Sequence, residues 1–273
     1  MKIVTEFVQK FLDDPQVVSR VFYPQRFNVP EESKKLRVLK FEVDKHVILG
    51  GLLFLDDEPN NKSTMMYFHG NGEVALHYEG LRPLFHQAGV NLAVFDFRAY
   101  GFSTGNLSYT ALLTDPIPLY HAFKAWMEKA YPGKSAEEFI LMGRSLGSAC
   151  ASALGAYEDA PAIKKVVFES GYSSVYDLMT RLFMLHHPQI TEESLSPFSN
   201  NTFQKKIKKP TLIIHGGRDD IIPISQGQEI FDSIPFNTPK QFIRIENATH
   251  NNIMMYGDQY FKPLGEFIQK KLN

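Results

Sequence analysis

The 273-residue chain has few cysteines, little net charge and no long apolar run. Cys150 is its only cysteine, which excludes an internal disulfide framework and a zinc site built on several cysteines, and is typical of a reducing compartment. With 29 basic and 30 acidic residues, the chain has no overall field that would attract nucleic acid. No apolar run approaches the roughly 20 residues that span a bilayer, and residues 1–25 lack the cleavage site of a secretory signal. We therefore expect a cytoplasmic protein without a nucleic-acid partner or a transmembrane segment.

Apolar residues are plentiful, since 44% of the chain is hydrophobic and 13% aromatic. This composition supplies a large core and leaves side chains to line an apolar pocket. A sheet-centred α/β domain often carries about 250 residues on one core, so we expect residues 1–273 to form a single domain.

Eight short apolar runs predict strands. The first two are adjacent and predict an antiparallel hairpin, whereas the other six alternate with helical stretches, which is typical of a parallel sheet with helices on both faces. We therefore expect an α/β fold with a mostly parallel, eight-stranded sheet flanked by helices. The predicted strands cover residues 36–41, 47–55, 64–68, 91–95, 139–142, 165–168, 211–214 and 241–245. The predicted helices cover residues 73–88, 118–130, 146–157, 225–234 and the chain from about 252.

The N-terminus carries an apolar stripe at helical spacing, formed by Ile3, Phe7, Val8, Phe11 and Leu12. Such a stripe predicts an amphipathic helix. Because basic residues are few there, we expect this helix to pack on the domain rather than to bind a membrane surface.

The connection at about 172–209 is too long for a plain crossover between the sixth and seventh predicted strands. It follows the carboxyl edge of the sheet, where open α/β sheets bind ligands. We therefore expect a short lid over the site, with an apolar underside that contacts the substrate. The candidate substrate-binding residues of the lid are Leu178, Leu182, Phe183 and Leu185.

Two pentapeptides match the pattern G-x-S-x-G, which places a serine on a sharp turn between a strand and a helix. One spans residues 143–147 around Ser145, and the other spans residues 101–105 around Ser103. The first directly follows a predicted strand and opens a helix of small residues, whereas Ser103 stands several residues past its strand and precedes a loop. Because the turn must lift the hydroxyl above the sheet edge, Ser145 is the predicted nucleophile and Ser103 a loop serine.

A nucleophilic serine needs an imidazole to accept its proton and a carboxylate to orient that imidazole. Downstream of this kind of turn, the acid and then the histidine follow later strands. Asp219 follows the predicted strand at 211–214 and His250 the one at 241–245. His250 is therefore the predicted base and Asp219 the predicted acid, with Asp220 and Glu169 as alternatives for the acid.

The tetrahedral intermediate of acyl transfer needs backbone N–H donors for its negative oxygen. One donor comes from the residue after the nucleophile and one from the loop after the third strand. That loop reads His69-Gly70-Asn71-Gly72, and its glycines allow close approach of the backbone. We expect the N–H groups of Asn71 and Leu146 to form this oxyanion hole, with His69 in a structural role.

Taken together, five motifs resemble the alpha/beta-hydrolase superfamily. They are HGNG at 69–72, DFRAYGFS at 96–103, GRSLG at 143–147, HG at 215–216 with Asp219 and Pro223, and His250. Their wording is similar to the small-lid subgroup described as serine-aminopeptidase-like or esterase-like. The resemblance implies the fold, the triad and acyl transfer. One residue departs from it, since Ala99 stands where the family usually has glycine, in a loop that supports the site.

We expect a carboxylic-ester hydrolase that acts on a small-molecule substrate with a small or medium acyl group, through an acyl-Ser145 intermediate and with no cofactor. No metal is expected either, since the chain lacks an H-E-x-x-H motif. A peptidase or thioesterase on the same triad is the alternative among enzymes, and a non-catalytic binding protein of this fold is the alternative outside them. An aminopeptidase would need a lid carboxylate to hold the substrate amine, for which Glu192 and Glu193 are available.

Overall fold

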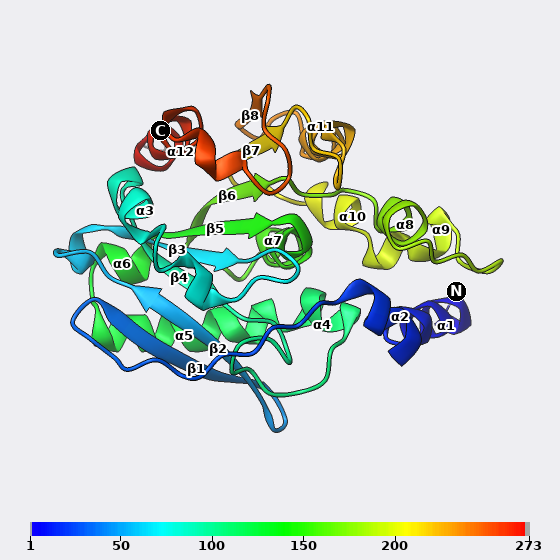
Figure 1. The fold of residues 1–273 in the computed structure, drawn as a ribbon, viewed down its shortest axis with the longest axis horizontal. Helices are drawn as coiled ribbons and strands as arrows, with labels where there is room; N and C mark the ends of the chain where they lie inside the picture. Colours follow the sequence, from blue (N-terminus) through cyan, green and yellow to red (C-terminus); the bar gives the residue numbers. More distant parts are fainter. Residues whose placement is uncertain (1, 271–273) are drawn as a thin grey trace.

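The computed structural model describes the backbone of residues 2–270 and the side chains of residues 5–270. An eight-stranded sheet runs through its middle in the order β1-β2-β4-β3-β5-β6-β7-β8 (Figure 1). β2 pairs antiparallel with β1 and β4, and every other neighbouring pair is parallel. The predicted fold class is thereby confirmed. The strands are β1 (Leu36–Asp44), β2 (Val47–Phe54), β3 (Ser63–Phe68), β4 (Val90–Phe95), β5 (Phe139–Arg144), β6 (Ile163–Glu169), β7 (Thr211–Gly216) and β8 (Lys240–Ile245).

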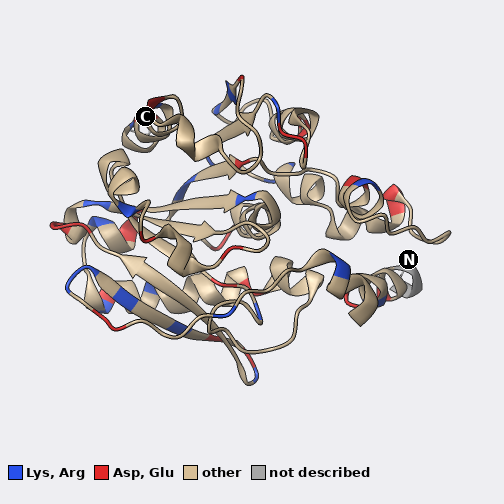
Figure 2. Cartoon of the chain, in the orientation of Figure 1, with Lys and Arg blue, Asp and Glu red and all other residues tan. Residues whose placement is uncertain are grey.

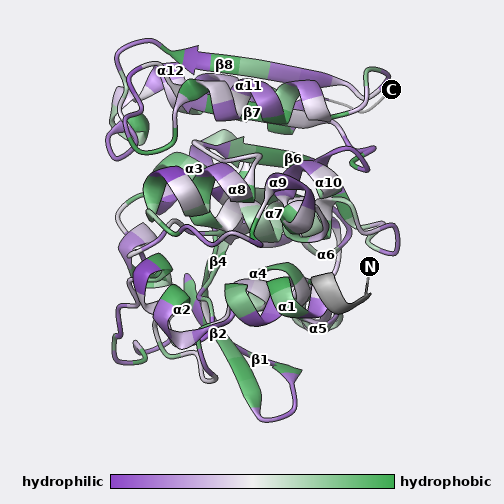
Figure 3. Ribbon diagram, turned by 90° about the vertical axis from the view of Figure 1, so that its right-hand side faces the viewer, coloured by the Kyte–Doolittle hydropathy of each residue, from purple (hydrophilic) through white to green (hydrophobic). Residues whose placement is uncertain are grey.

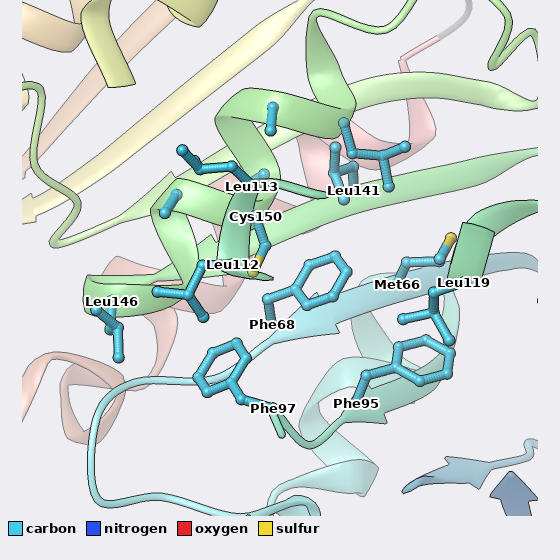
Figure 4. Packing of buried hydrophobic residues seen from close by; sticks show 14 of the residues in the cluster. Met66, Phe68, Phe95, Phe97, Leu112, Leu113, Leu119, Leu141, Leu146 and Cys150 are labelled. Atoms are coloured by element: carbon cyan, nitrogen blue, oxygen red, sulfur yellow. The ribbon is translucent and has the colours of Figure 1, made fainter. Parts of the chain in front are cut away.

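The two faces of the sheet are buried in two hydrophobic clusters. Alternate residues of a strand point to opposite faces, so Met66 and Phe68 of β3 lie in one cluster while Met65 and Tyr67 lie in the other. Figure 4 shows the first cluster gathered between the central strands and the helices that cover them. Those helices are α4 (Tyr109–Thr114), α5 (Pro116–Ala130), α7 (Ser148–Gly155) and α11 (Ile224–Ser233); α3 (Arg82–Ala88) and α12 (Asp258–Gln269) cover the opposite face.

Polar residues lie on the outside of this layered arrangement. Figure 2 shows Lys and Arg interspersed with Asp and Glu over the outer elements and loops. Hydrophobic and hydrophilic residues alternate around α11, as Figure 3 shows, because one side of the helix faces the sheet and the other faces solvent. No helix in the described part of the chain is long and apolar enough to cross a membrane.

The helix predicted at 73–88 is broken in the structure. A short 3-10 turn, η2 (Ala75–Tyr78), is followed by a separate helix that begins at Arg82. Pro83 stands in the first turn of that second helix. Proline has no N–H to donate and clashes with the preceding turn, so a helix arriving from residue 73 cannot continue through it.

The N-terminal stripe packs on the domain as expected. It belongs to α1 (Lys2–Leu12), in which Val8 and Leu12 are fully buried and Phe7 and Phe11 partly buried. The side chain of Ile3 lies outside the described residues. A second helix, α2 (Pro15–Val21), begins after the capping residue Asp14, whose side chain accepts a hydrogen bond from the N–H of Gln16.

The segment between β6 and β7 holds only short helical pieces, at the carboxyl end of the sheet (Figure 1). Figures 1 and 3 place it beside the N-terminal helices, and the ring of His187 lies 5.3 Å from that of Phe7. The pieces are α8 (Val175–Asp177), η4 (Leu178–Leu182), α9 (Glu192–Leu195), η5 (Ser196–Phe198) and α10 (Asn200–Gln204). The remaining short elements are η1 (Pro59–Asn61), α6 (Lys134–Glu137), η3 (Ser145–Gly147) and η6 (Ile253–Tyr256).

Candidate active site

Ser145 directly follows β5 and is the first residue of the short helix η3, at a tight turn of the chain. Its φ of 49° is left-handed, a conformation that a non-glycine residue adopts only when its surroundings hold it there. Two glycines make room for the turn. A Cβ on Gly143 would lie 2.4 Å from the carbonyl oxygen of Gly147, and one on Gly147 would lie 2.1 Å from the carbonyl oxygen of Phe68. The helix after Ser145 therefore packs directly against β5 and β3.

Three side chains from three different loops form a continuous hydrogen-bonded chain. His250 Nε2 lies 2.9 Å from Ser145 Oγ, and His250 Nδ1 lies 2.8 Å from Asp219 Oδ2. All three residues are largely buried. The structure thus brings together the predicted nucleophile, base and acid in a geometry suited to proton transfer from the hydroxyl.

The environment of Asp219 keeps its carboxylate charged. Burial by itself raises the pKa of Asp219, but the hydrogen bond and charge of His250 and the N–H of Ile222 outweigh burial and leave this pKa below its usual range. The other carboxylate oxygen accepts the N–H groups of Ile221 and Ile222 at 3.1 and 2.8 Å. A fixed anion at Nδ1 favours the imidazole tautomer whose Nε2 is free to accept a proton.

The alternative residues are placed differently. Asp220 is exposed. Glu169 is fully buried, and its carboxylate accepts hydrogen bonds from Arg144 at 2.8 Å and from the hydroxyl of Tyr260 at 2.6 Å. The hydroxyl of Ser103 is also occupied, because it donates to the carbonyl of Asp96 and accepts the N–H of Gly50. None of these three contacts His250 by a hydrogen bond in the described part of the chain.

The glycine-rich loop after β3 lies beside Ser145, where both Asn71 and Leu146 line the same pocket. Leu146 stands in the first turn of a helix, so its N–H has no partner within that helix. The side chain of Asn71 is anchored by Tyr100, whose hydroxyl donates to Oδ1 at 2.6 Å, and by the carbonyl of Val21, which accepts from Nδ2 at 2.6 Å. The Asn71 side chain thus ties this loop to the C-terminal end of α2 and to Tyr100.

Ala99, the departure from the family pattern, lies in the loop after β4. Its φ is 65°, a left-handed conformation that glycine adopts freely and that costs alanine of order 1 kcal/mol. The turn is nevertheless held, because the carbonyl of Ala99 accepts a hydrogen bond from Arg26 at 3.1 Å.

A pocket of about 320 Å³ opens above Ser145 and His250. Leu178, Leu182 and Phe183 line it from the segment between β6 and β7. Leu185 does not line it: Met184 adopts a φ of 53°, and the chain turns so that Leu185 is buried in the core instead. Among the described residues, no cluster of three or more His, Cys, Asp or Glu side chains is arranged to hold a metal ion.

Several residues that line the pocket were not predicted from the sequence. Ile221 and Ile222 come from the loop of Asp219, and Tyr23 from the chain after α2. Glu73 and Arg144 contribute a charged pair to its wall, with Arg144 Nε 2.8 Å from Glu73 Oε1. A charged residue at the end of an otherwise apolar strand is the signal that could have singled out Arg144, because unpaired charges are almost never buried.

Comparison with known proteins gives consistent similarities. The sequence model of the family described as "Serine aminopeptidase, S33" matches residues 59–199, slightly more than half of the chain. Protein bem46 of Schizosaccharomyces pombe is 28% identical over 90% of this chain and 79% of its own length. The human alpha/beta hydrolase domain-containing protein 17B is 28% identical over 81% of this chain and 71% of its own length.

Solved structures show a similar fold. A Pyrococcus furiosus esterase superposes with a TM-score of 0.67 at 23% identity, covering 90% of this chain and 98% of its own. An acylaminoacyl peptidase from Pyrococcus horikoshii superposes with a TM-score of 0.64 at 16% identity, covering 87% of this chain and 42% of its own. Two chemistries, ester and peptide cleavage, therefore occur among proteins that share this sheet and its flanking helices.

Proposed function

The chain belongs to the serine aminopeptidase (S33) family within the alpha/beta-hydrolase superfamily, and on this premise we propose that it hydrolyses a carboxylic ester of a small or medium acyl chain. The observation that carries this proposal is the hydrogen-bonded chain Ser145–His250–Asp219 at the base of a pocket with an apolar lid. In it, Ser145 is the nucleophile, His250 the general base and Asp219 the residue that orients the imidazole. No cofactor takes part.

The proposed reaction has two halves. Ser145 Oγ attacks the ester carbonyl as His250 Nε2 accepts its proton, and the N–H groups of Asn71 and Leu146 stabilise the resulting oxyanion. His250 then gives the proton to the departing alcohol, which leaves an acyl-Ser145 intermediate. Water, deprotonated by His250, releases the acid and restores the serine.

The lid segment, residues 172–209, supplies the specificity in this proposal. Leu178, Leu182 and Phe183 present apolar surface to the pocket, and such surface binds a hydrocarbon chain better than a charged group. Each side chain that the acyl chain covers contributes up to roughly 1.5–3 kcal/mol of binding.

Peptide cleavage with recognition of a free amine is disfavoured by the charges in the pocket. The three carboxylates of the lid, Asp177, Glu192 and Glu193, do not line it. Glu73 does line it, but Arg144, Tyr78 and the N–H of Gly70 already occupy its oxygens. A thioester would fit the same pocket and the same triad, and it is the second candidate substrate.

A fluorophosphonate probe tests the proposal, because it reacts with an activated serine. We expect the wild type to label and to hydrolyse short and medium acyl esters faster than aminoacyl peptides. Ser145→Ala should lose activity by about six orders of magnitude, while Ser103→Ala keeps most of it. Equal labelling of wild type and Ser145→Ala would exclude the proposed nucleophile. A folded wild type that neither labels nor hydrolyses any ester or thioester would point to a non-catalytic binding protein.

A further inference from the structure

Arg144 is a buried cation that occupies the variable position of the GRSLG turn, next to the proposed nucleophile. Its side chain is only 7% exposed. It reaches away from Ser145 and lies between two loops, the oxyanion loop (residues 69–72) and the loop that carries His250 (residues 246–252). Nothing in the reaction proposed above uses this charge.

Toward the oxyanion loop, Arg144 acts through Glu73. Arg144 Nε donates to Glu73 Oε1 at 2.8 Å, and Glu73 Oε2 accepts the N–H of Gly70 at 2.9 Å and the hydroxyl of Tyr78 at 2.6 Å. A Cβ on Gly70 would lie 3.1 Å from the carboxylate, so the glycine is what lets Glu73 come this close. By holding the N–H of Gly70, Glu73 sets the direction of the following peptide, which carries the N–H of Asn71.

Toward the other loop, Arg144 holds the backbone of the base itself. Nη1 donates to the carbonyl of His250 at 3.1 Å, and Nη2 to Oδ1 of Asn251 at 3.4 Å. Nη1 also donates to Glu169 at 2.8 Å, and Glu169 in turn accepts the hydroxyl of Tyr260. Glu169 thus anchors the guanidinium to the end of β6.

The chemistry of the cation fits this bridging position. A guanidinium has five N–H donors in a rigid plane, so it can bind two carboxylates and a carbonyl in fixed directions at once. A lysine at the same position would keep the positive charge but could not make hydrogen bonds in these fixed directions. Arg144 binds the main-chain carbonyl of His250, and its partner Glu73 binds the main-chain N–H of Gly70, so the pair connects the backbones of the two loops that flank Ser145.

We infer that Arg144 and Glu73 are positioning residues, which hold the Asn71 N–H and the His250 ring at the correct positions relative to Ser145. The inference rests on the proposed function, since it assigns these residues a task in the same acyl transfer. Neither side chain touches the reacting atoms in this scheme. Without Arg144 or Glu73, we expect the Asn71 N–H and the His250 ring to shift. Because these groups act mainly in the transition state, kcat should fall while substrate binding stays nearly unchanged.

The test compares Glu73→Gln and Arg144→Lys with the wild type on one ester. Active sites are counted by the end-point of fluorophosphonate labelling, so that kcat refers to folded, reactive protein. A displacement of about 1 Å costs on the order of 10²-fold in rate. We expect kcat to fall about 10²-fold in each variant, with KM within about threefold and labelling complete at long times. The double variant should be little slower than the slower single one, because both break the same connection.

A matched control is Arg98→Lys. Arg98 also makes a bidentate pair, partly buried, in which it donates to both oxygens of Asp115 at 2.7 Å, but it has no contact with Ser145, His250 or the oxyanion loop in the described structure. Its loss should lower the melting temperature and leave kcat per active site within about twofold.

The outcomes separate the two proposals. A wild type without hydrolysis or labelling refutes the proposed function itself. An active wild type with unchanged kcat in Glu73→Gln and Arg144→Lys overturns the positioning role alone, as does a rise in KM that accounts for the whole loss. If Arg144→Lys does not fold, Tyr78→Phe removes one bond to Glu73 and should still lower kcat several-fold at constant KM. An unchanged kcat in Tyr78→Phe and Glu73→Gln would then overturn the inference.

Discussion

Replacing Gly147 with alanine tests how closely the nucleophile turn must approach β3. Gly147 has a φ of −63° and a ψ of −13°, which alanine adopts without backbone strain. The added Cβ would instead lie 2.1 Å from the carbonyl oxygen of Phe68, 2.6 Å from its carbonyl carbon and 2.8 Å from the carbonyl oxygen of His69. All three are backbone atoms, and none can rotate away as a side chain would.

The overlap gives the size of the expected movement. Carbon atoms attract best at about 3.5–4.0 Å, so the new methyl group pushes η3 away from β3 by roughly 1 Å. The Leu146 N–H and Ser145 move with η3, whereas Asn71 stays with the loop that follows β3. A mismatch of about 1 Å between these groups costs on the order of 10²-fold in rate, and overpacking of this kind costs typically 1–3 kcal/mol in stability.

The assay is kcat/KM on an ester, the rate of fluorophosphonate labelling and a thermal melt, measured for Gly147→Ala and for Gly80→Ala as control. A Cβ on Gly80 meets nothing within 4 Å. We expect Gly147→Ala to lose about 10²-fold in kcat/KM and in labelling rate and to melt a few degrees lower, while Gly80→Ala matches the wild type. Wild-type rates in Gly147→Ala would refute the argument that this close approach aligns the site.

Three further predictions concern the acid, the lid and the carboxylate of Glu73. Asp219→Asn should cost about 10⁴ in kcat because the asparagine favours the wrong imidazole tautomer, and Asp220→Asn should be close to wild type; the reverse result would reassign the acid. Phe183→Ala should shift preference among acyl chain lengths by up to roughly a hundredfold with labelling within about tenfold, and an unchanged preference would argue against a substrate lid. Burial raises the pKa of Glu73, but the charge of Arg144 and the hydrogen bonds from Arg144 and Tyr78 outweigh burial and lower this pKa from 4.5 to about 2. The ionised carboxylate therefore stabilises the fold above about pH 4.5, and this contribution is lost as pH falls toward 2. In urea unfolding, the free energy of unfolding of the wild type should fall by about 3 kcal/mol over this pH range because of Glu73. Glu73→Gln should lack this part of the pH dependence, and an equal acid sensitivity of the two proteins would contradict the prediction.

Local patterns were enough to predict the sheet and the elements around Ser145. Apolar runs separated by helical stretches predict a parallel sheet because buried strands read as continuous apolar segments, and all eight strands are present. The spacing of Gly143 and Gly147 around Ser145 is likewise local, since both glycines serve the turn between β5 and η3. The helix predicted at 73–88 was wrong because Pro83 outweighs the apolar periodicity.

Only the tertiary structure decided which groups meet at the site. Asp219, Asp220 and Glu169 all lie at or after strand ends, and their spacing only slightly favours Asp219; the 2.8 Å contact with His250 identifies Asp219 as its partner. Arg144 bonds to Glu73 and to the carbonyl of His250, residues 71 and 106 positions away along the chain. Periodicity reports which face of an element is buried, but it carries no information on contacts between distant loops. Those contacts depend on how the sheet brings the carboxyl ends of its strands to one edge.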